Sequence, residues 1–290
     1  MVHATPASQV PHPLSDADIS AVRRHPGFRA AVEAYAAANL ARYHALGLVE
    51  RWMVSDMGRA SLSGAVVVLD ALGRLTPATL MASQPVARGE VSRGRARLYL
   101  QRAVANGLID PAERGAPLRG DTALSPTPRF QAVMTGILKV ALEAAATLAP
   151  EVAPALGEIG RQEFVRRFAA HVGAITASRP DLFPLASPVQ LFQARDGGTR
   201  LLEGLVVRQS PGRERLLLSC AYSHSALARA SRCSRAHVIQ LLQEGQARGF
   251  LRLNGRALTI APELSDDAER YFATHFATAR TATTRALAEA

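Results

Sequence analysis

Hydrophobic residues recur at helical spacing along most of the chain, and short alternating patterns follow some of these stretches. The segment SRAHVIQLLQEGQARGFLRLNGRALTIA (234–261) shows both patterns in succession. Its apolar stripe consists of Val238, Leu241 and Leu242. This spacing predicts a helix, with Ser234 as its N-cap. Gly249 would end the helix, because glycine adopts the left-handed conformation at little cost.

A hairpin is predicted directly after this helix, and a shorter helix before it. Residues 250–260 alternate as two strands do, and Asn254-Gly255 between them suits a two-residue type I′ turn. Upstream, SHSALARAS (223–231) predicts a helix that Ser223 caps. Two helices joined by a tight turn and followed by a hairpin predict a helix-turn-helix with a wing. A small α+β corner of an enzyme is the alternative.

The same pattern occurs a second time, 142 residues earlier in the chain. The segment SRGRARLYLQRAVANGLI (92–109) aligns without a gap with SRAHVIQLLQEGQARGFL (234–251). The identical pairs are Ser92/Ser234, Arg93/Arg235, Leu100/Leu242, Gln101/Gln243, Ala105/Ala247 and Gly107/Gly249. They include the predicted N-cap, the core face and the terminating glycine, which helix formation constrains most. The repeat predicts a second winged unit.

Further elements complete both units in the same order. In the first, Thr76-Pro77 is typical of a helix start, and the polar residues 110–125 predict a longer wing. The first unit is predicted to have a helix over 61–75 before it and one over 128–148 after it. The second unit is predicted to have a helix over 199–209 before it and one over 266–286 after it, and Asp266 would cap the last helix. We therefore expect a mainly α fold with small β-wings, in which tandem winged helix-turn-helix domains are joined by long helices.

Polar and proline-rich segments divide the chain into four parts. We predict a flexible tail over 1–14, and N-terminal helices with the first winged helix-turn-helix over 15–149. A helical linker would follow over 150–188, and the second winged helix-turn-helix with its C-terminal helix over 189–290. The tail is predicted from its polar composition and its prolines.

Basic residues concentrate on the two proposed units. The formal net charge is +10, and 33 of the 34 basic residues are arginine. Residues 201–260 hold nine arginines against three glutamates, and residues 88–121 hold seven arginines against four acidic residues. These two windows therefore carry +9 of the excess charge. Double-stranded DNA is the expected partner, because neutralising its phosphates releases counterions and supplies most non-specific affinity.

The exposed face near the start of each second helix holds the candidate DNA contacts. This end of a recognition helix enters the major groove, where arginine can bind guanine and glutamine can bind adenine. The candidates are Ser92, Arg93, Arg95 and Arg97 with Arg114 and Arg119 on the first wing, and Ser234, Arg235, His237 and Gln240 with Arg252 and Arg256 on the second wing. The alternative is a solvated basic helix face.

No sequence motif indicates catalysis, a metal site or a cofactor. GxSxG, HExxH, P-loop and GxGxxG patterns do not occur, and the two cysteines form no CxxC pair. Cys233 lies beside Arg232 and Arg235, whose charges would lower a thiol pKa, so a redox sensor and a half-buried turn residue stay alternatives. The best apolar run, 65–69, is too short to span a membrane. We expect a cytoplasmic, nucleoid-associated protein that is no enzyme and has no membrane partner.

The order of elements resembles that of the MarR-type winged-helix regulators. ALSPTPRFQAVMTGILKVAL (123–142) looks like the family's passage from wing to last helix, and the segment 92–109 looks like its recognition helix. The resemblance covers about residues 55–148 and, more loosely, 199–286. It implies a bacterial transcriptional regulator that binds double-stranded DNA. The family uses two copies of one winged unit, whereas this chain holds both units itself.

We expect the two units to act as a pseudo-dimer on half-sites about 34 Å apart. A homodimer on a palindromic site is an alternative, and RNA polymerase or a small-molecule effector would be further partners. Two other functions stay open. One is a plasmid-type replication initiator, which binds repeated origin sites. The other is a protein-binding winged-helix scaffold, which would have acidic or neutral wings.

Overall fold

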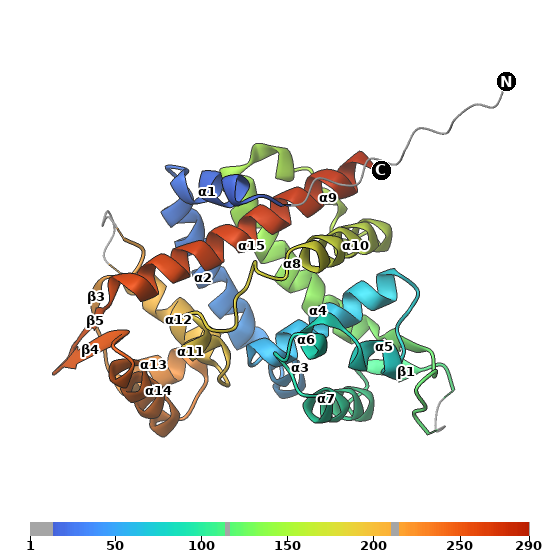
Figure 1. Cartoon of the computed structure of the whole chain (residues 1–290), viewed down its shortest axis with the longest axis horizontal. Coiled ribbons are helices and arrows are strands. Elements are labelled where there is room, and N and C mark those ends of the chain that lie inside the picture. The colour runs from blue at the N-terminus through green and yellow to red at the C-terminus, as the bar shows by residue number, and fades with distance from the viewer. Residues whose placement is uncertain (1–13, 114–116, 210–214, 290) are drawn as a thin grey trace.

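Helices make up most of the fold, with small antiparallel sheets beside them (Figure 1). The computed structural model describes residues 14–113, 117–209 and 215–289. The first part of the chain forms α1 (Asp16–Arg24), α2 (Phe28–Ala45), α3 (Leu48–Met53), α4 (Met57–Ala71), α5 (Pro77–Met81), α6 (Gln84–Ala87) and α7 (Arg93–Ala105). The middle forms β1 (Ile109–Pro111), β2 (Leu124–Pro126), α8 (Pro128–Leu148), η1 (Pro150–Val152), α9 (Ala155–Glu158), α10 (Gln162–Ser178) and α11 (Gln190–Gln193). The last part forms α12 (Gly198–Val207), β3 (Ser219–Ala221), α13 (His224–Ser231), α14 (Arg235–Ala247), β4 (Leu251–Asn254), β5 (Ala257–Ile260) and α15 (Pro262–Ala288).

Two units of the chain share one order of elements. Unit 1 (residues 57–148) runs from α4 through α5, α6 and α7 to the β1–β2 hairpin and the long α8. Unit 2 (residues 198–288) runs from α12 through α13 and α14 to the β4–β5 hairpin and the long α15. The expectation of a mainly α fold with small β-hairpins is confirmed.

The repeated sequence forms the same local structure in both units. Helices α7 and α14 have 13 residues each. Each begins behind a serine, Ser92 or Ser234, whose hydroxyl accepts a hydrogen bond from the N–H three residues on (3.2 and 3.1 Å). Gly107 and Gly249 follow the helices with φ of 65° and 77°. The predicted caps and helix ends are therefore confirmed. The serine hydroxyls accept N–H groups of the first turn, and the glycines adopt the left-handed conformation that ends the helix.

Each unit carries a small antiparallel sheet. In unit 2 the strand order is β3-β5-β4. In unit 1, β1 pairs with β2, and the Leu124 N–H also donates to the Leu75 carbonyl (3.0 Å). Leu75 precedes α5 as β3 precedes α13, so a single hydrogen bond in unit 1 takes the place that a third strand has in unit 2.

The turn of the second hairpin lies one residue later than predicted. Asn254 pairs with Ala257, so Gly255 and Arg256 form the two-residue turn. Gly255 has a φ of 58°, whereas Arg256 has no positive φ. This combination fits a type II′ turn, which needs glycine only at its first central position, and not the predicted type I′ turn. The tip of the hairpin therefore carries the Arg256 side chain.

Two helix starts also differ from the prediction. Helix α4 begins at Met57 and not at 61, because the Asp56 carboxylate accepts the Arg59 N–H (3.0 Å) and caps the helix there. Helix α15 begins at Pro262, since proline suits the first helical position. Asp266 is thus no cap, and it forms an ion pair with an arginine of α1 (2.8 Å).

Helices α2 and α10 pack in reciprocal ways on the two units. Helix α2, which precedes unit 1, packs on α8 of unit 1 and on α12 of unit 2. Helix α10, which precedes unit 2, packs on α15 of unit 2 and on α4 of unit 1. Helices α8 and α15 also pack on each other. Residues 150–188, predicted as a linker, therefore contribute α10 to the core, and the division into domains stays a prediction.

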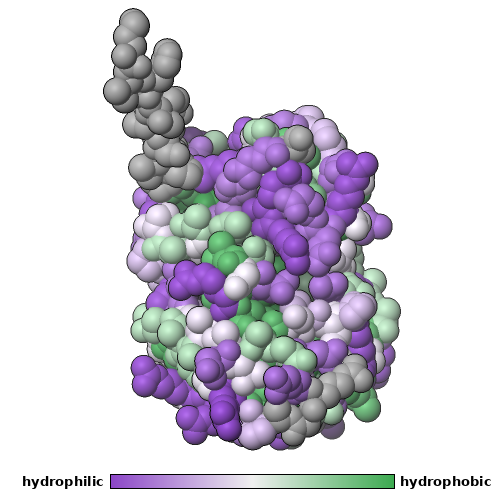
Figure 2. Space-filling model, turned by 90° about the vertical axis from the view of Figure 1, so that its right-hand side faces the viewer, coloured by the Kyte–Doolittle hydropathy of each residue, from purple (hydrophilic) through white to green (hydrophobic). Residues whose placement is uncertain are grey.

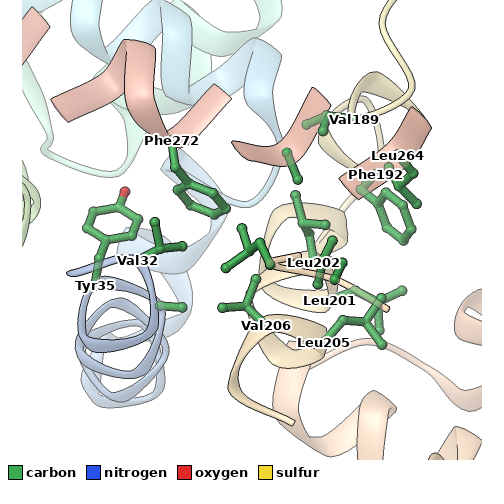
Figure 3. Packing of buried hydrophobic residues seen from close by; sticks show 14 of the residues in the cluster. Val32, Tyr35, Val189, Phe192, Leu201, Leu202, Leu205, Val206, Leu264 and Phe272 are labelled. Carbon is green, nitrogen blue, oxygen red and sulfur yellow. The ribbon is translucent and has the colours of Figure 1, made fainter. Parts of the chain in front are cut away.

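The largest core cluster includes the junction of α2, α12 and α15 (Figure 3). There Val32 and Tyr35 of α2 lie against Phe272 of α15, beside the leucine-rich face of α12. Leu14, placed in the predicted flexible tail, belongs to this cluster and is 1% exposed, so the prediction is wrong for this residue. The rest of the predicted tail, 1–13, lies outside the described residues. The helices at the start of the chain thus stabilise unit 2 as well as unit 1.

Helix α8 corrects the expectation about apolar runs. Among the described helices it alone is long and apolar enough to cross a membrane. It packs on α2 and α15, and less than half of its apolar stretch is buried in the fold.

His275 should make the stability of the fold depend on pH. It is half-buried beside the rings of Tyr35 and Tyr271, and desolvation by these surroundings lowers its pKa from 6.5 to about 4. As pH falls, the unfolded chain takes up the proton first. We expect this histidine to lower the free energy of unfolding by about 3 kcal/mol between pH 6.5 and pH 4. Urea unfolding of the His275→Phe variant should lack this part of the pH dependence. An equal pH dependence in both proteins would contradict the prediction.

Candidate nucleic-acid interface

Helices α7 and α14 lie along the lower edge of the molecule in Figure 1, one in each unit. Both bury an apolar face, with Tyr99 and Leu100 in α7 and with Leu241 and Leu242 in α14. Figure 2, which shows the unit 1 end of the molecule, has many hydrophilic residues along this edge. Both repeated helices therefore lie at one edge of the fold, and each has exposed residues besides its buried face.

All four candidates at the start of α7 are exposed as expected, and three of them form no ion pair with a described residue. Ser92, Arg93 and Arg97 all face solvent. The Ser92 oxygen caps the helix, which leaves its hydroxyl hydrogen free to donate to a ligand. The side chains of Arg93 and Arg97 form no ion pair with any residue that the structure describes. Their charges are therefore free for an external anion.

Arg95 differs from its neighbours on α7. Its Nη2 lies 2.6 Å from Oδ1 of Asp56, a carboxylate that is only 2% exposed. Asp56 also caps α4, so this ion pair joins α7 to the first helix of its unit. The predicted groove-facing role is weakened for Arg95, because binding a phosphate would require breaking a partly buried pair.

The start of α14 presents a smaller set of polar groups. Ser234, Arg235 and Gln240 are exposed, and Arg235 forms no ion pair within the described parts of the chain. His237 is half-buried, and its Nε2 atom is buried without a hydrogen-bond partner among the described residues. The ring thus packs against the protein and does not extend from the helix as predicted.

The hairpins add further exposed arginines at the ends of the units. Arg252 on β4 and Arg256 at the turn are exposed, and no described residue forms an ion pair with either. In unit 1, Arg119 is exposed, and its N–H donates to Thr122 Oγ1 (2.9 Å). Arg114 lies outside the described residues.

The two helices carry almost no negative charge of their own. Helix α7 has no acidic residue, and α14 has only Glu244. Burial opposes ionisation of Glu244, but Arg195 and Arg248 outweigh it and lower the carboxyl pKa. Since both arginines bind this carboxylate (2.7 and 2.6 Å), it is neutralised within the protein. The exposed face therefore keeps its positive character.

An aromatic stack behind α7 was not foreseen from the sequence. The only tryptophan, Trp52 of α3, stacks on Tyr99 of α7 with ring centroids 5.5 Å apart. The guanidinium groups of Arg59 and Arg102 lie over the Trp52 ring at 5.5 and 5.9 Å. These contacts join helices distant in sequence, which no local spacing rule detects, and they hold α7 against α3 and α4.

Cys233 is a half-buried residue in the turn between α13 and α14. Burial raises the pKa of its thiol, contrary to the lowering expected from Arg232 and Arg235. The thiol donates to the backbone carbonyl of Asp196 (3.1 Å). This environment favours the turn-residue interpretation over a reactive thiolate. In the described ranges, no three potential metal ligands lie together.

Arg232 occupies a strained backbone position in the same turn. Its φ is 55°, the one positive value at a non-glycine residue in the described chain. Since this conformation costs roughly 1–2 kcal/mol outside glycine, Arg232→Gly should raise the free energy of unfolding by up to about 1 kcal/mol. Arg232→Ala removes the same charge without relieving the strain, and it should bring no gain. Equal denaturant midpoints for the two variants would contradict this account.

Compared with protein-family models, with curated proteins and with solved structures, the chain matches none of them. Its function is therefore inferred from its own residues. The relevant features are the repeated helix, the unpaired arginines on it and the reciprocal packing of the two units.

Proposed function

We propose that the chain is a sequence-specific regulator of transcription that binds double-stranded DNA through two winged helix-turn-helix units. One observation carries the proposal. Two helices of equal length and matching caps lie at one edge of the molecule, and arginines without an ion-pair partner among the described residues stand in their first turns, Arg93 and Arg97 on α7 and Arg235 on α14. Such helices are suited to enter successive major grooves with their N-terminal ends.

In this proposal the residues divide by what they contact on DNA. Arg93, Arg97 and Arg235 would contact guanine edges or phosphates, and Gln240 would contact adenine. Arg252 and Arg256 on the hairpin would bind phosphates beside the groove. Ser92 and Ser234 would donate from their hydroxyls to phosphates near the helix ends.

The reciprocal packing supports a pseudo-dimer built from one chain. In the MarR-type family that the sequence resembles, two chains pair through their terminal helices. Here α8 and α15, the last helices of the two units, pack on each other within a single chain. The exposed residues differ between α7 and α14, so a single chain should bind two unlike half-sites.

Genome-wide recovery of DNA bound to the tagged protein tests the proposal in cells. Wild type should give sharp promoter peaks that Arg93→Ala/Arg235→Ala loses. Peaks confined to repeats at a replication origin would favour an initiator instead. Absence of any peak would contradict DNA binding and favour a protein-binding scaffold.

A further inference from the structure

Two sets of ionic contacts, joined through the backbone between Arg195 and Asp196, connect α7 of unit 1 with α14 of unit 2. Arg95 on α7 binds Asp56 (2.6 Å), and Asp56 also binds Arg59 (3.2 Å). Arg59 in turn binds Asp196 on the loop before α12, the first helix of unit 2 (2.8 Å). The next residue back in the chain, Arg195, binds Glu244 on α14 (2.7 Å). We call Arg95, Asp56, Arg59, Asp196, Arg195 and Glu244 the inter-unit bridge.

Backbone contacts hold the centre of this bridge. The Gly197 N–H donates to the Ser55 carbonyl (2.7 Å), and the Ser55 hydroxyl donates to the Asp196 carboxylate (2.9 Å). On its other side, the Asp196 carbonyl accepts from the Cys233 thiol. The loop before α12 is thus attached both to the α3–α4 corner and to the turn before α14.

The fit around this loop is tight. Gly197 has a φ of 66°, and a Cβ atom built on it would lie 2.2 Å from Cys233 Sγ and 2.8 Å from the Ser231 carbonyl oxygen. Only glycine permits both this conformation and this approach. A small shift of the loop would therefore displace the turn that leads into α14.

The bridge combines weak and strong contacts. Asp196 is exposed over 61% of its side chain, so its pair with Arg59 alone would contribute little. The buried Asp56 and the backbone hydrogen bond from Gly197 add contacts that solvent screens less. Burial disfavours the Asp196 carboxylate, but Ser55 and Arg59 outweigh it and lower its pKa. The carboxylate therefore stays ionised near neutral pH.

We propose that the inter-unit bridge is a positioning device that fixes the separation of α7 and α14, and thereby selects the spacing between two DNA half-sites. This inference rests on the proposed function, because it names the feature of DNA that the two units would measure together. Arg95 acts in it by holding α7 in place and not by binding DNA.

Charge reversal at Asp196 tests the device. Asp196→Arg places a cation against Arg59 on an exposed residue, and Asp181→Arg makes the same charge change at an exposed carboxylate paired with Arg179, away from the bridge. The probes are duplexes with two half-sites from the wild-type site, separated by spacers that change one base pair at a time. Wild type and Asp181→Arg should prefer one spacer by about tenfold or more, since the wrong spacing costs one helix its base contacts.

In Asp196→Arg the spacer preference should fall to about twofold or less, while affinity for a single half-site is retained. The milder variant Asp196→Asn should change the spacer preference in the same direction. It keeps the test valid if the charge reversal prevents folding. An unchanged spacer preference in both folded variants would overturn the inference while leaving DNA binding in place.

A measurement without DNA separates the inference from the proposed function. Spin labels on Gln101→Cys and Gln243→Cys, both exposed, report the separation of α7 and α14 in a Cys220→Ala/Cys233→Ser background. Serine at 233 keeps a hydrogen-bond donor for the Asp196 carbonyl. We expect a narrow distance distribution that broadens with Asp196→Arg. Equal widths would overturn the bridge even if DNA binding is established. A broadening without any DNA binding would refute the proposed function and the selection of half-site spacing, and it would leave only the positioning of the two helices by the bridge.

Discussion

Replacing both Arg93 and Arg235 with alanine is expected to weaken binding to a duplex site about 100-fold. Each arginine lies in the first turn of its helix, is exposed and has no ion-pair partner in the described chain. Losing one such contact costs roughly 1–3 kcal/mol, and the two sites are independent because they belong to different units. Fluorescence anisotropy of a labelled duplex over a range of salt concentrations measures the loss. The slope of log affinity against log salt should fall by about 2 if both arginines contact phosphates.

The matched control removes two arginines elsewhere. Arg24 on α1 and Arg166 on α10 are exposed, and both helices lie in the upper part of Figure 1, away from α7 and α14. The Arg24→Ala/Arg166→Ala variant changes the net charge by the same amount, and it should bind DNA nearly as wild type does. Equal losses in both double variants would mean that binding follows net charge alone.

Replacing Arg200 with methionine is expected to lower the free energy of unfolding by about 3–5 kcal/mol. Arg200 and Glu203 form a buried pair on α12, with Nη1 at 2.9 and 2.7 Å from the two carboxylate oxygens. Burial raises the pKa of Glu203 despite the arginine. Without Arg200, only Asn39 of α2 would remain as a hydrogen-bond donor to this carboxylate (2.7 Å). The change therefore leaves the buried carboxylate without its hydrogen-bonded cation where α2 meets α12, and of the two arginines that favour its ionised form only Arg42 remains nearby.

Urea unfolding at neutral pH measures this effect. The double variant Arg200→Met/Glu203→Leu should recover a large part of the loss, because replacing both partners of a buried pair is often close to neutral. A loss below about 1 kcal/mol in the single variant would contradict the account, since it would mean that solvent reaches Glu203. No recovery in the double variant would show that packing of the arginine stem matters more than its charge.

Local features of the fold were predictable from the sequence where a particular residue type is needed to cap a helix or to adopt a positive φ. Ser92 and Ser234 cap their helices, and Gly107 and Gly249 take positive φ behind them, as the repeat indicates. Helix α8 spans Pro128–Leu148 as predicted, because Pro128 defines its start. These features depend on contacts within a few residues.

Long-range features were not predictable in this way. The reciprocal packing of α2 and α10 depends on which helices meet in space. Because residues 150–188 were predicted as a linker, the sequence did not indicate that α10 packs on both units as α2 does. Arg95 looked like its neighbours on α7 until the fold brought Asp56 beside it. The half-buried position of His237 follows from its surroundings in the fold. The DNA-contacting roles of the exposed arginines stay predictions.

Selection of duplexes from a random DNA pool by the purified chain tests the central claim most directly. The account predicts one enriched motif made of two unlike half-sites about 34 Å apart, bound by a single chain. Enrichment of no motif over a control without protein would contradict DNA recognition. Enrichment of a perfect palindrome bound by two chains would contradict the pseudo-dimer.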